Sequence, residues 1–276
     1  MKFTKMHGIG NDYIYINLFE EKVENPAELS ILLSDRRKGV GGDGIILIGP
    51  SKNADFYMHM YNLDGSEGKM CGNGVRCVGK YVYDKGLTQK DIITVETLSG
   101  IKTLKLNVSG GKVDTVRVNM GAPILKSCEI PVNSTLEEFI NQPIEVEGTI
   151  YHLTCLSMGN PHAVVYVEDV SALNLEQIGP KFEHYHLFPD RINTEFVQVL
   201  DSEHLKMRVW ERGSGETMAC GTGACAVLVA SVLNGKAKRT AEVQLLGGNL
   251  EIEWNEADNK VYMTGSATTV FEGELV

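Results

Sequence analysis

Two short stretches, "MCGNGVRC" at residues 70–77 and "ACGTGACA" at residues 219–226, share the pattern Cys-Gly-x-Gly and decide how this chain is organised. Glycine after the cysteine, and again two residues later, lets a loop turn sharply into a helix and leaves the first backbone N–H groups open to a ligand. An apolar run follows each motif, and a glycine suited to a left-handed helix cap closes each run, at Gly86 and Gly235. The pattern therefore predicts two helices that each begin at a cysteine.

The chain consists of two related halves. At an offset of 149 residues, Gly10-Asn11 aligns with Gly159-Asn160 and Cys71-Gly72 aligns with Cys220-Gly221. Three segments rich in β-branched and aromatic residues precede each predicted helix, which is typical of strands. These segments are residues 12–18, 44–49 and 54–62 in the first half and 162–169, 195–200 and 204–211 in the second. We interpret the chain as a duplication.

The predicted helices differ in character. The run after Cys220 is apolar nearly all round, so it predicts a buried central helix. Segments 26–34 and 135–141 predict short amphipathic helices on the surface. The stretch 119–126 is the expected junction between the halves, since no low-complexity linker is present.

Composition excludes several classes of protein. A chain of 276 residues with 43% hydrophobic residues is long enough for two domains with cores of their own. The net charge of −10 argues against a nucleic-acid partner, because phosphate binding needs clustered lysine and arginine. No stretch reaches the roughly 18 apolar residues of a membrane span. We therefore expect a cytoplasmic protein with a small-molecule partner and with its six cysteines reduced.

The paired cysteines suggest proton transfer. The positive end of a helix dipole favours thiolate over thiol by up to ~2 kcal/mol, or roughly 1.5 pKa units. If both sulfurs face one cleft about 7 Å apart, two thiolates would repel by about 2 kcal/mol, so one thiolate and one thiol should share the site. Inversion of a carbon centre needs this pair, because one group removes a proton from one face while the other delivers a proton to the opposite face. The helix starts would bind a carboxylate beside that carbon.

Other uses of cysteine are weaker. The remaining four cysteines are expected to be small buried hydrophobes; they are Cys77, Cys128, Cys155 and Cys225. A four-cysteine zinc site from Cys71, Cys77, Cys220 and Cys225 is disfavoured, because the paired ligands are separated by five and four residues that lie within predicted helices, where two to four are usual in structural sites. A redox dithiol would need Cys-x-x-Cys, which is absent.

Several motifs, taken in order, resemble those of the diaminopimelate epimerase family. They are "GIGNDY" (8–13), "GVGGDGI" (39–45), "YNLDGSE" (61–67), "MCGNGVRC" (70–77), "MGNPHAVVYV" (158–167), "FPDRINTEFVQV" (188–199) and "WERGSGETMACGTGACA" (210–226). The resemblance implies a cofactor-independent isomerase, without pyridoxal phosphate, metal or nucleotide. Such an enzyme interconverts LL- and meso-2,6-diaminopimelate for lysine and peptidoglycan precursors.

The resemblance also assigns roles to residues of this chain. It makes Cys71 and Cys220 the acid/base pair and makes His162 a supporting group. The backbone of Gly72-Asn73 and of Gly221-Thr222 would hold the carboxylate at the reacting centre. The remaining matches to the family's substrate pocket are Asn11, Asn62, Asn160, Asn193, Glu211 and Arg212.

The fold expected with this resemblance is α+β. Two pseudo-symmetric domains would each wrap a curved, barrel-like mixed sheet round a central helix, with the active site in the cleft between them. We place the first domain at residues 1–118, with strand 266–276 returning to it, and the second at residues 119–265. A homodimer is compatible with the sequence.

Two alternatives stay open at this stage. The first is a cofactor-independent racemase of another amino acid, for example of the histidine or proline type. The second is an amino-acid-binding protein without catalysis. One departure from the family concerns Gly44, because some members carry glutamine there. We interpret the neighbouring Asp43 as a residue that shapes its loop.

Overall fold

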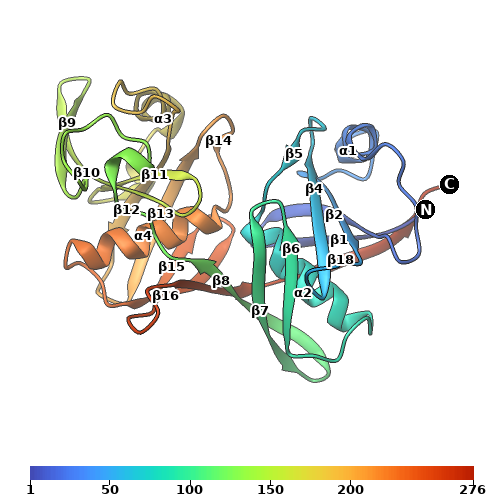
Figure 1. The fold of residues 1–276 in the computed structure, drawn as a ribbon. Coiled ribbons are helices and arrows are strands. Elements are labelled where there is room, and N and C mark those ends of the chain that lie inside the picture. The colour runs from blue at the N-terminus through green and yellow to red at the C-terminus, as the bar shows by residue number, and fades with distance from the viewer. The chain divides into compact units, whose positions relative to one another are not determined.

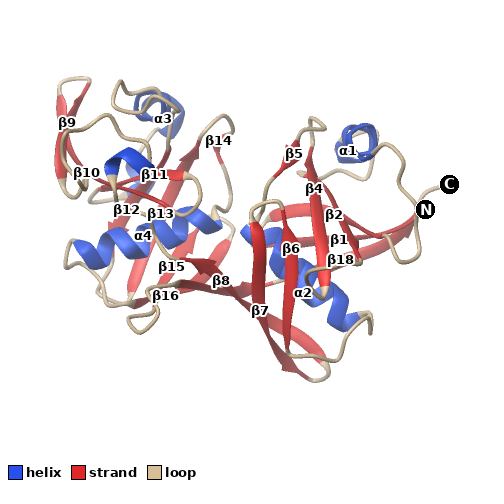
Figure 2. Cartoon of the chain, in the orientation of Figure 1, coloured by secondary structure: helices blue, strands red, loops and turns tan.

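The computed structural model describes residues 1–276 and divides them into two compact units. Unit 1 comprises Met1–Asn119 and Thr264–Val276, and unit 2 comprises Met120–Met263. Strands dominate both units and each contains few helices, as Figure 2 shows. The predicted α+β class is therefore confirmed.

Unit 1 is a mixed sheet with one long helix packed on it. Its strands lie in the order β18–β1–β2–β3–β4–β6–β7–β8, where β2/β3 and β4/β6 are parallel and the other pairs are antiparallel. Helix α2 (Gly72–Asp84) packs against β1, β2 and β7, and α1 (Pro26–Ser34) packs against β3 and β4. The strands are β1 (Lys2–Gly8), β2 (Asn11–Asn17), β3 (Gly44–Gly49), β4 (Phe56–Asn62), β5 (Glu67–Gly68), β6 (Ile92–Thr97), β7 (Gly100–Ser109), β8 (Lys112–Gly121) and β18 (Thr268–Glu274).

Unit 2 repeats this plan. Its paired strands lie in the order β9–β10–β11–β12–β13–β15–β16, with β11/β12 and β13/β15 parallel. The strands are β9 (Gln142–Val146), β10 (Thr149–Ser157), β11 (Pro161–Tyr166), β12 (Asn193–Val199), β13 (His204–Glu211), β14 (Gly215–Glu216), β15 (Thr240–Leu245), β16 (Gly248–Trp254) and β17 (Val261–Ser266). The helices are η1 (Ser127–Glu129), η2 (Val170–Ala172), α3 (Leu175–Glu183) and α4 (Gly221–Leu233).

Helix α4 is the central helix of unit 2. It contacts β10, β11, β12, β13, β15 and β16, and Figure 1 shows it passing across the strands of its own unit. Residues on all of its sides are buried, because its sequence carries no charged residue. A curved sheet that surrounds an apolar helix removes that helix from water on every face. The predicted buried helix is confirmed.

The two units agree in the register of their strand pairing. Ile14 lies opposite Ile45 in the parallel pair of unit 1, and Ala163 lies opposite Thr194 in the parallel pair of unit 2. Both residues of the second pair follow those of the first by the same 149 positions. Since a slip of one residue would turn every side chain to the other face, this agreement supports the duplication inferred from the sequence.

One predicted helix is wrong. Segment 26–34 forms α1 as expected, but residues 135–141 form no helix. Their backbone groups bond outward instead, with the Glu137 carbonyl accepting from Ser127 N and the Phe139 carbonyl accepting from Cys155 N. Phe139 is buried in the core of unit 2, so tertiary contacts outweigh the local helical pattern. None of the helices that do form is long and apolar enough to cross a membrane.

Gly44 can be nothing but glycine in this backbone. Its φ is +155°, and an added Cβ would lie 2.0 Å from the Tyr61 carbonyl oxygen. A glutamine at this position would require the strand pair β3/β4 to move apart locally.

The packing of α3 leads to a stability prediction. An added Cβ on Gly179 would lie 2.3 Å from the Trp210 ring, which also donates to Glu183 through its indole nitrogen at 2.8 Å. We expect Gly179→Ala to destabilise unit 2 by about 1–3 kcal/mol, because the ring has no room to give way. Urea unfolding followed by tryptophan fluorescence measures the change. Gln177→Ala on the exposed side of the same helix is the control, and equal stability of both variants would contradict the packing argument.

Candidate active site

Cys71 and Cys220 occupy the same structural position in the two units. Cys71 is the N-cap residue of α2 with φ −126° and ψ 118°, and Cys220 is the N-cap residue of α4 with φ −122° and ψ 104°. An N-cap side chain lies beside the unpaired N–H groups of the first helical turn. Gly74 donates one of them to Cys71 Sγ at 3.3 Å. Both sulfurs therefore lie at the positive end of a helix.

The second glycine of each Cys-Gly-x-Gly motif, Gly74 or Gly223, leaves space at the start of its helix. A Cβ on Gly223 would lie 3.2 Å from Cys220 Sγ and 2.7 Å from a carboxylate oxygen of Glu195. A Cβ on Gly74 would lie 2.6 Å from the Ile46 side chain. A side chain at either position would displace the groups that contact the helix start.

The amide of Asn11 contacts Cys71. Cys71 Sγ lies 3.1 Å from Asn11 Oδ1, and the same oxygen accepts from Asn73 Nδ2 at 3.4 Å. Asn11 Nδ2 donates to Asp43 Oδ2 at 2.7 Å. Because the nitrogen of the amide is bound to a carboxylate, its oxygen is the end that faces the sulfur.

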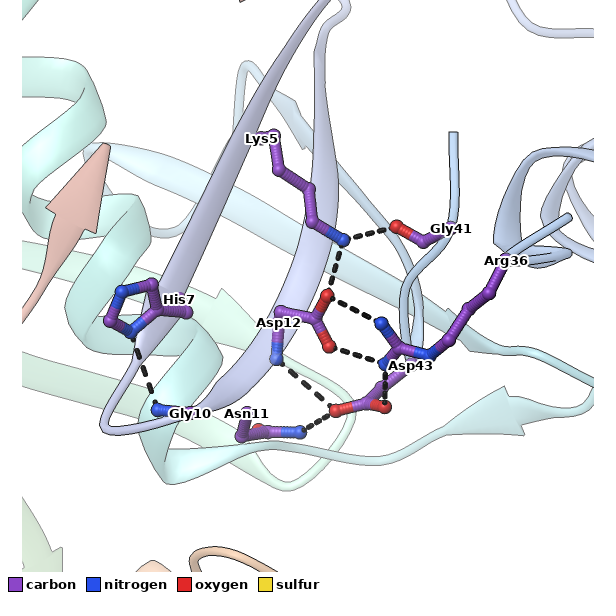
Figure 3. Close-up of polar contacts among 8 residues, drawn as sticks. All are labelled: Lys5, His7, Gly10, Asn11, Asp12, Arg36, Gly41 and Asp43. Atoms are coloured by element: carbon purple, nitrogen blue, oxygen red, sulfur yellow. Dashed lines mark hydrogen bonds and ion pairs between the residues drawn. The ribbon is translucent and has the colours of Figure 1, made fainter. Parts of the chain in front are cut away.

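Asp43 anchors this arrangement. It also accepts from the backbone N–H of Asp12 at 3.1 Å and from Arg36 Nη2 at 3.0 Å, as Figure 3 shows. Arg36 forms a second, two-pronged contact with Asp12, which Lys5 neutralises from the other side. Asp43 shapes its loop, as the sequence suggests, and it also orients the side chain that contacts Cys71.

Cys220 lies in a different electrostatic environment. It is 5% exposed, and burial raises its pKa well above its ordinary value, with the negative charges of Glu211 and Glu195 adding to the effect. The Thr222 hydroxyl, 3.6 Å from Sγ, and the Gly223 N–H act in the opposite direction. The helix end expected to favour a thiolate is therefore outweighed, and Cys220 is a thiol at neutral pH.

Glu211 is itself a perturbed carboxyl group. Burial raises its pKa, although hydrogen bonds from Thr217 and Cys220 oppose that rise. It stands at the end of β13, at the position that Asn62 occupies at the end of β4 in the other half. The second unit thus has an ionisable group where the first has a neutral amide.

His162 does not contact a sulfur directly. Its side chain is fully buried, with Nδ1 2.7 Å from Glu195 Oε1 and Nε2 3.0 Å from Asn160 Oδ1. Asn160 Nδ2 donates to the Thr222 hydroxyl at 3.3 Å. His162 therefore reaches the N-terminus of α4 through Asn160.

The other predicted residues make contacts within their own units. Asn62 Nδ2 donates to Ser66 Oγ at 3.0 Å. Asn193 donates to the Pro161 carbonyl at 2.8 Å and accepts from the backbone N–H of Arg212 at 2.9 Å. Arg212 is exposed, and its Nη1 donates to the Asp190 carbonyl at 2.9 Å. Asn193 thus positions the backbone of the arginine.

One buried ionisable residue escaped the sequence reasoning. Glu195 is fully buried on β12, and its only signal in the sequence is an acidic residue at the start of the strand-like run "EFVQVL". A charge inside such a strand is costly unless other groups satisfy it. A search for acidic residues in predicted core strands near the predicted site would have found Glu195.

The remaining cysteines lie away from the helix starts. Cys77, Cys155 and Cys225 are buried, Cys128 is exposed, and burial raises the pKa of Cys77 to about 11. No group of three or more His, Cys, Asp or Glu side chains is placed to hold a metal ion. These four cysteines have no geometry that suggests chemistry.

The environment of Cys220 leads to a prediction about its titration. Glu211→Gln removes a neighbouring negative charge, so the pKa of Cys220 should fall and the thiolate should form at lower pH. The pH dependence of iodoacetamide labelling, followed at Cys220 by peptide mass, measures the midpoint. Glu251→Gln, an exposed substitution in the same unit, is the control. An unchanged midpoint in Glu211→Gln would mean that Glu211 does not contribute to the raised pKa of Cys220.

Comparisons with known proteins place the chain in a family. The family model described as Diaminopimelate epimerase matches residues 3–126 and 154–270. The chain is 64% identical over 275 residues to a protein of Acetivibrio thermocellus named "Diaminopimelate epimerase", covering 100% of this chain and 98% of the relative. It is 59% identical over 275 residues to a protein of that name from Methanococcus maripaludis, covering 100% of this chain and 99% of the relative.

A solved structure shares the fold. The hydroxyproline epimerase of Agrobacterium vitis superposes with a TM-score of 0.70 at 15% sequence identity, over 99% of this chain and 91% of that one. The likeness at this identity concerns the fold alone. On the evidence of the family model and of the two full-length relatives, this chain belongs to the diaminopimelate epimerase family.

Proposed function

We propose that this chain interconverts LL- and meso-2,6-diaminopimelate and that Cys71 and Cys220 are the two acid/base groups of the reaction. The observation that carries the proposal is the placement of one cysteine at the N-cap of each equivalent helix, in a chain whose relatives bear the name of this activity. The reaction is an isomerisation that proceeds without pyridoxal phosphate. Its product serves lysine and peptidoglycan precursor biosynthesis.

The two cysteines act in turn. One thiolate removes the proton from the α-carbon, and the thiol on the opposite face delivers its own proton to the same carbon. In the free enzyme Cys220 holds its proton, because burial and the carboxylates beside it raise its pKa. Cys71 is then the group that accepts the proton of the substrate, and the roles reverse for the opposite reaction.

The helix starts stabilise the charge that develops. As the α-proton leaves, negative charge moves onto the carboxylate beside the reacting carbon. The N–H groups of Gly72-Asn73 and Gly221-Thr222 belong to the first turns of α2 and α4, where backbone donors have no partner within the helix. Donors fixed in advance stabilise such charge without reorganising during the reaction.

The remaining polar groups fit the rest of the substrate. Diaminopimelate carries a carboxylate and an ammonium at each end. The planar guanidinium of Arg212 suits the distal carboxylate, and the amides of Asn11, Asn62, Asn160 and Asn193 supply further hydrogen bonds. Glu211 suits an ammonium near Cys220. A homodimer and a cytoplasmic location stay predictions.

The cysteine pair gives the most direct prediction. Cys71→Ser and Cys220→Ser should each reduce epimerisation at least about 100-fold, because a hydroxyl is a poor replacement for a thiol in general acid–base catalysis. Incubation with LL-diaminopimelate in deuterated water, followed by mass measurement of the α-carbon label, detects proton exchange as well as net turnover. Cys128→Ser changes an exposed cysteine and should retain full activity. A binding protein without catalysis would incorporate no label even as the wild type.

Substrate choice gives a second prediction. Arg212→Ala should raise KM for diaminopimelate about tenfold or more, because the distal carboxylate loses a charged hydrogen-bond partner. The matched control is Arg117→Ala, which removes an arginine outside the predicted pocket. A wild type that prefers proline, histidine or another monocarboxylic amino acid in competition would favour the racemase alternative instead.

A further inference from the structure

The second unit contains a buried carboxylate that the proposed chemistry does not use. Glu195 on β12 is fully buried, and its Oε2 has no hydrogen-bond partner, while its Oε1 contacts His162. The equivalent residue on β3 of the first unit is Ile46, also fully buried. The fold of a half is therefore built equally well with an apolar side chain at this position.

A chain of hydrogen bonds leads from this carboxylate to Cys220. Glu195 Oε1 lies 2.7 Å from His162 Nδ1, and His162 Nε2 lies 3.0 Å from Asn160 Oδ1. Asn160 Nδ2 lies 3.3 Å from the Thr222 hydroxyl oxygen, which in turn lies 3.6 Å from Cys220 Sγ. Each member of the chain thus fixes the orientation of the next.

The direction of these bonds follows from what each atom can donate. Asn160 donates its Nδ2 hydrogen to Thr222, so its Oδ1 is an acceptor and faces His162 Nε2. His162 Nδ1 faces the carboxylate of Glu195, which is also an acceptor when ionised. If Glu195 is ionised, both ring nitrogens donate and the ring carries two protons. The Thr222 hydroxyl oxygen accepts from Asn160, so its own hydrogen is available for Cys220 Sγ.

We propose that Glu195 is ionised and is a positioning residue, which keeps His162 doubly protonated and so aligns Asn160 and Thr222 to donate a hydrogen bond to Cys220. This inference rests on the proposed function of Cys220. The donated bond stabilises the sulfur in the part of the cycle in which it has given up its proton. It opposes the carboxylates of Glu211 and Glu195, which favour the protonated sulfur.

Every element that packs near Cys220 contributes to this balance. Glu211 comes from β13, Glu195 from β12, His162 from β11, and the Thr222 hydroxyl and Gly223 N–H from α4. On β10, Cys155 feels the charge of Glu195, and burial keeps it a thiol. A charge enclosed in this way costs free energy, and an apolar isostere is usually tolerated or stabilising. Retaining Glu195 where the other half has isoleucine is therefore explained better by the chemistry than by the fold.

The first test uses the wild-type protein without any turnover. Nitrogen-15 NMR of histidine-labelled protein at pH 8 should show one of the seven histidines with both ring nitrogens protonated, and loss of that signal in His162→Gln assigns it. A neutral His162 in the wild type would overturn the proposal. Because this spectrum does not depend on the substrate, inactivity toward diaminopimelate would refute the proposed function and leave this result readable.

The second test separates positioning from structure. Glu195→Gln should convert His162 to a neutral ring and lower kcat about 10-fold to 100-fold, with KM changed by less than about threefold. Glu251→Gln on the surface of the unit is the matched control. Full kcat in a folded Glu195→Gln variant, or loss of activity with His162 still doubly protonated, would overturn the proposal.

A double-variant cycle tests the route to the sulfur. Thr222→Val removes the hydroxyl and leaves the backbone donor of α4 in place. If Glu195 acts through that hydroxyl, Glu195→Gln should lower kcat less than about twofold in the Thr222→Val background. Equal losses in both backgrounds would mean that Glu195 does not act through Thr222, and the proposed route would be wrong.

Discussion

The N-terminus of a helix that begins at a cysteine is the constraint on which this structure depends. Four backbone N–H groups at such an end have no partner within the helix, and a side chain at the N-cap lies beside them. A thiol at the N-cap places a group that can carry a proton beside backbone N–H groups that can bind an anion, all within the first turn of the helix. Gly74 and Gly223 are needed for this, because the side chains of Ile46 and Glu195 occupy the space that a Cβ would take.

The two halves share a backbone and differ in charge. On α2 the fully buried Arg76 donates to the Gly72 carbonyl at 3.3 Å and to the Ser266 carbonyl at 3.2 Å, while the equivalent residue of α4 is Cys225. Beneath α4 the buried charge is Glu195, where β3 has Ile46. Besides burial, the negative charge of Glu195 raises the pKa of Cys220 and so favours its thiol form. Duplication supplies two similar helix starts, and these substitutions make them chemically unequal.

Local patterns predicted much of the fold, whereas the contacts around the two cysteines come from residues far apart in the sequence. The strand segments 44–49 and 204–211 form β3 and β13 with the expected bounds, because each alternates or is uniformly apolar between turn residues. The predicted helix at 135–141 is absent because tertiary contacts decide that segment. The helix α3 was not predicted, although Asn174 caps it and Glu176 lies in its first turn, because Pro180 interrupts the helical pattern. The roles of Asp43 and Glu195 depend on side chains brought together from separate strands, and no local pattern reports such contacts. The raised pKa of Cys220 likewise follows from burial, which the sequence around the cysteine does not reveal.

Unequal thiols are also useful to a reaction that must run in both directions. A thiol with a raised pKa is a weaker acid, but its thiolate is a stronger base, so Cys220 is well suited to remove a proton once it has given up its own. A hydrogen bond from Thr222 stabilises that thiolate and opposes the rise that burial causes in the pKa of Cys220. The carboxylates of Glu211 and Glu195 destabilise the thiolate and favour its reprotonation. At the other helix, Asn11 accepts from the Cys71 thiol and Gly74 N–H donates to the same sulfur. The first contact suits the thiol, and the second suits the thiolate. An epimerase needs each sulfur to exist as thiol and as thiolate near neutral pH. Contacts that favour opposite protonation states keep the free-energy difference between thiol and thiolate small.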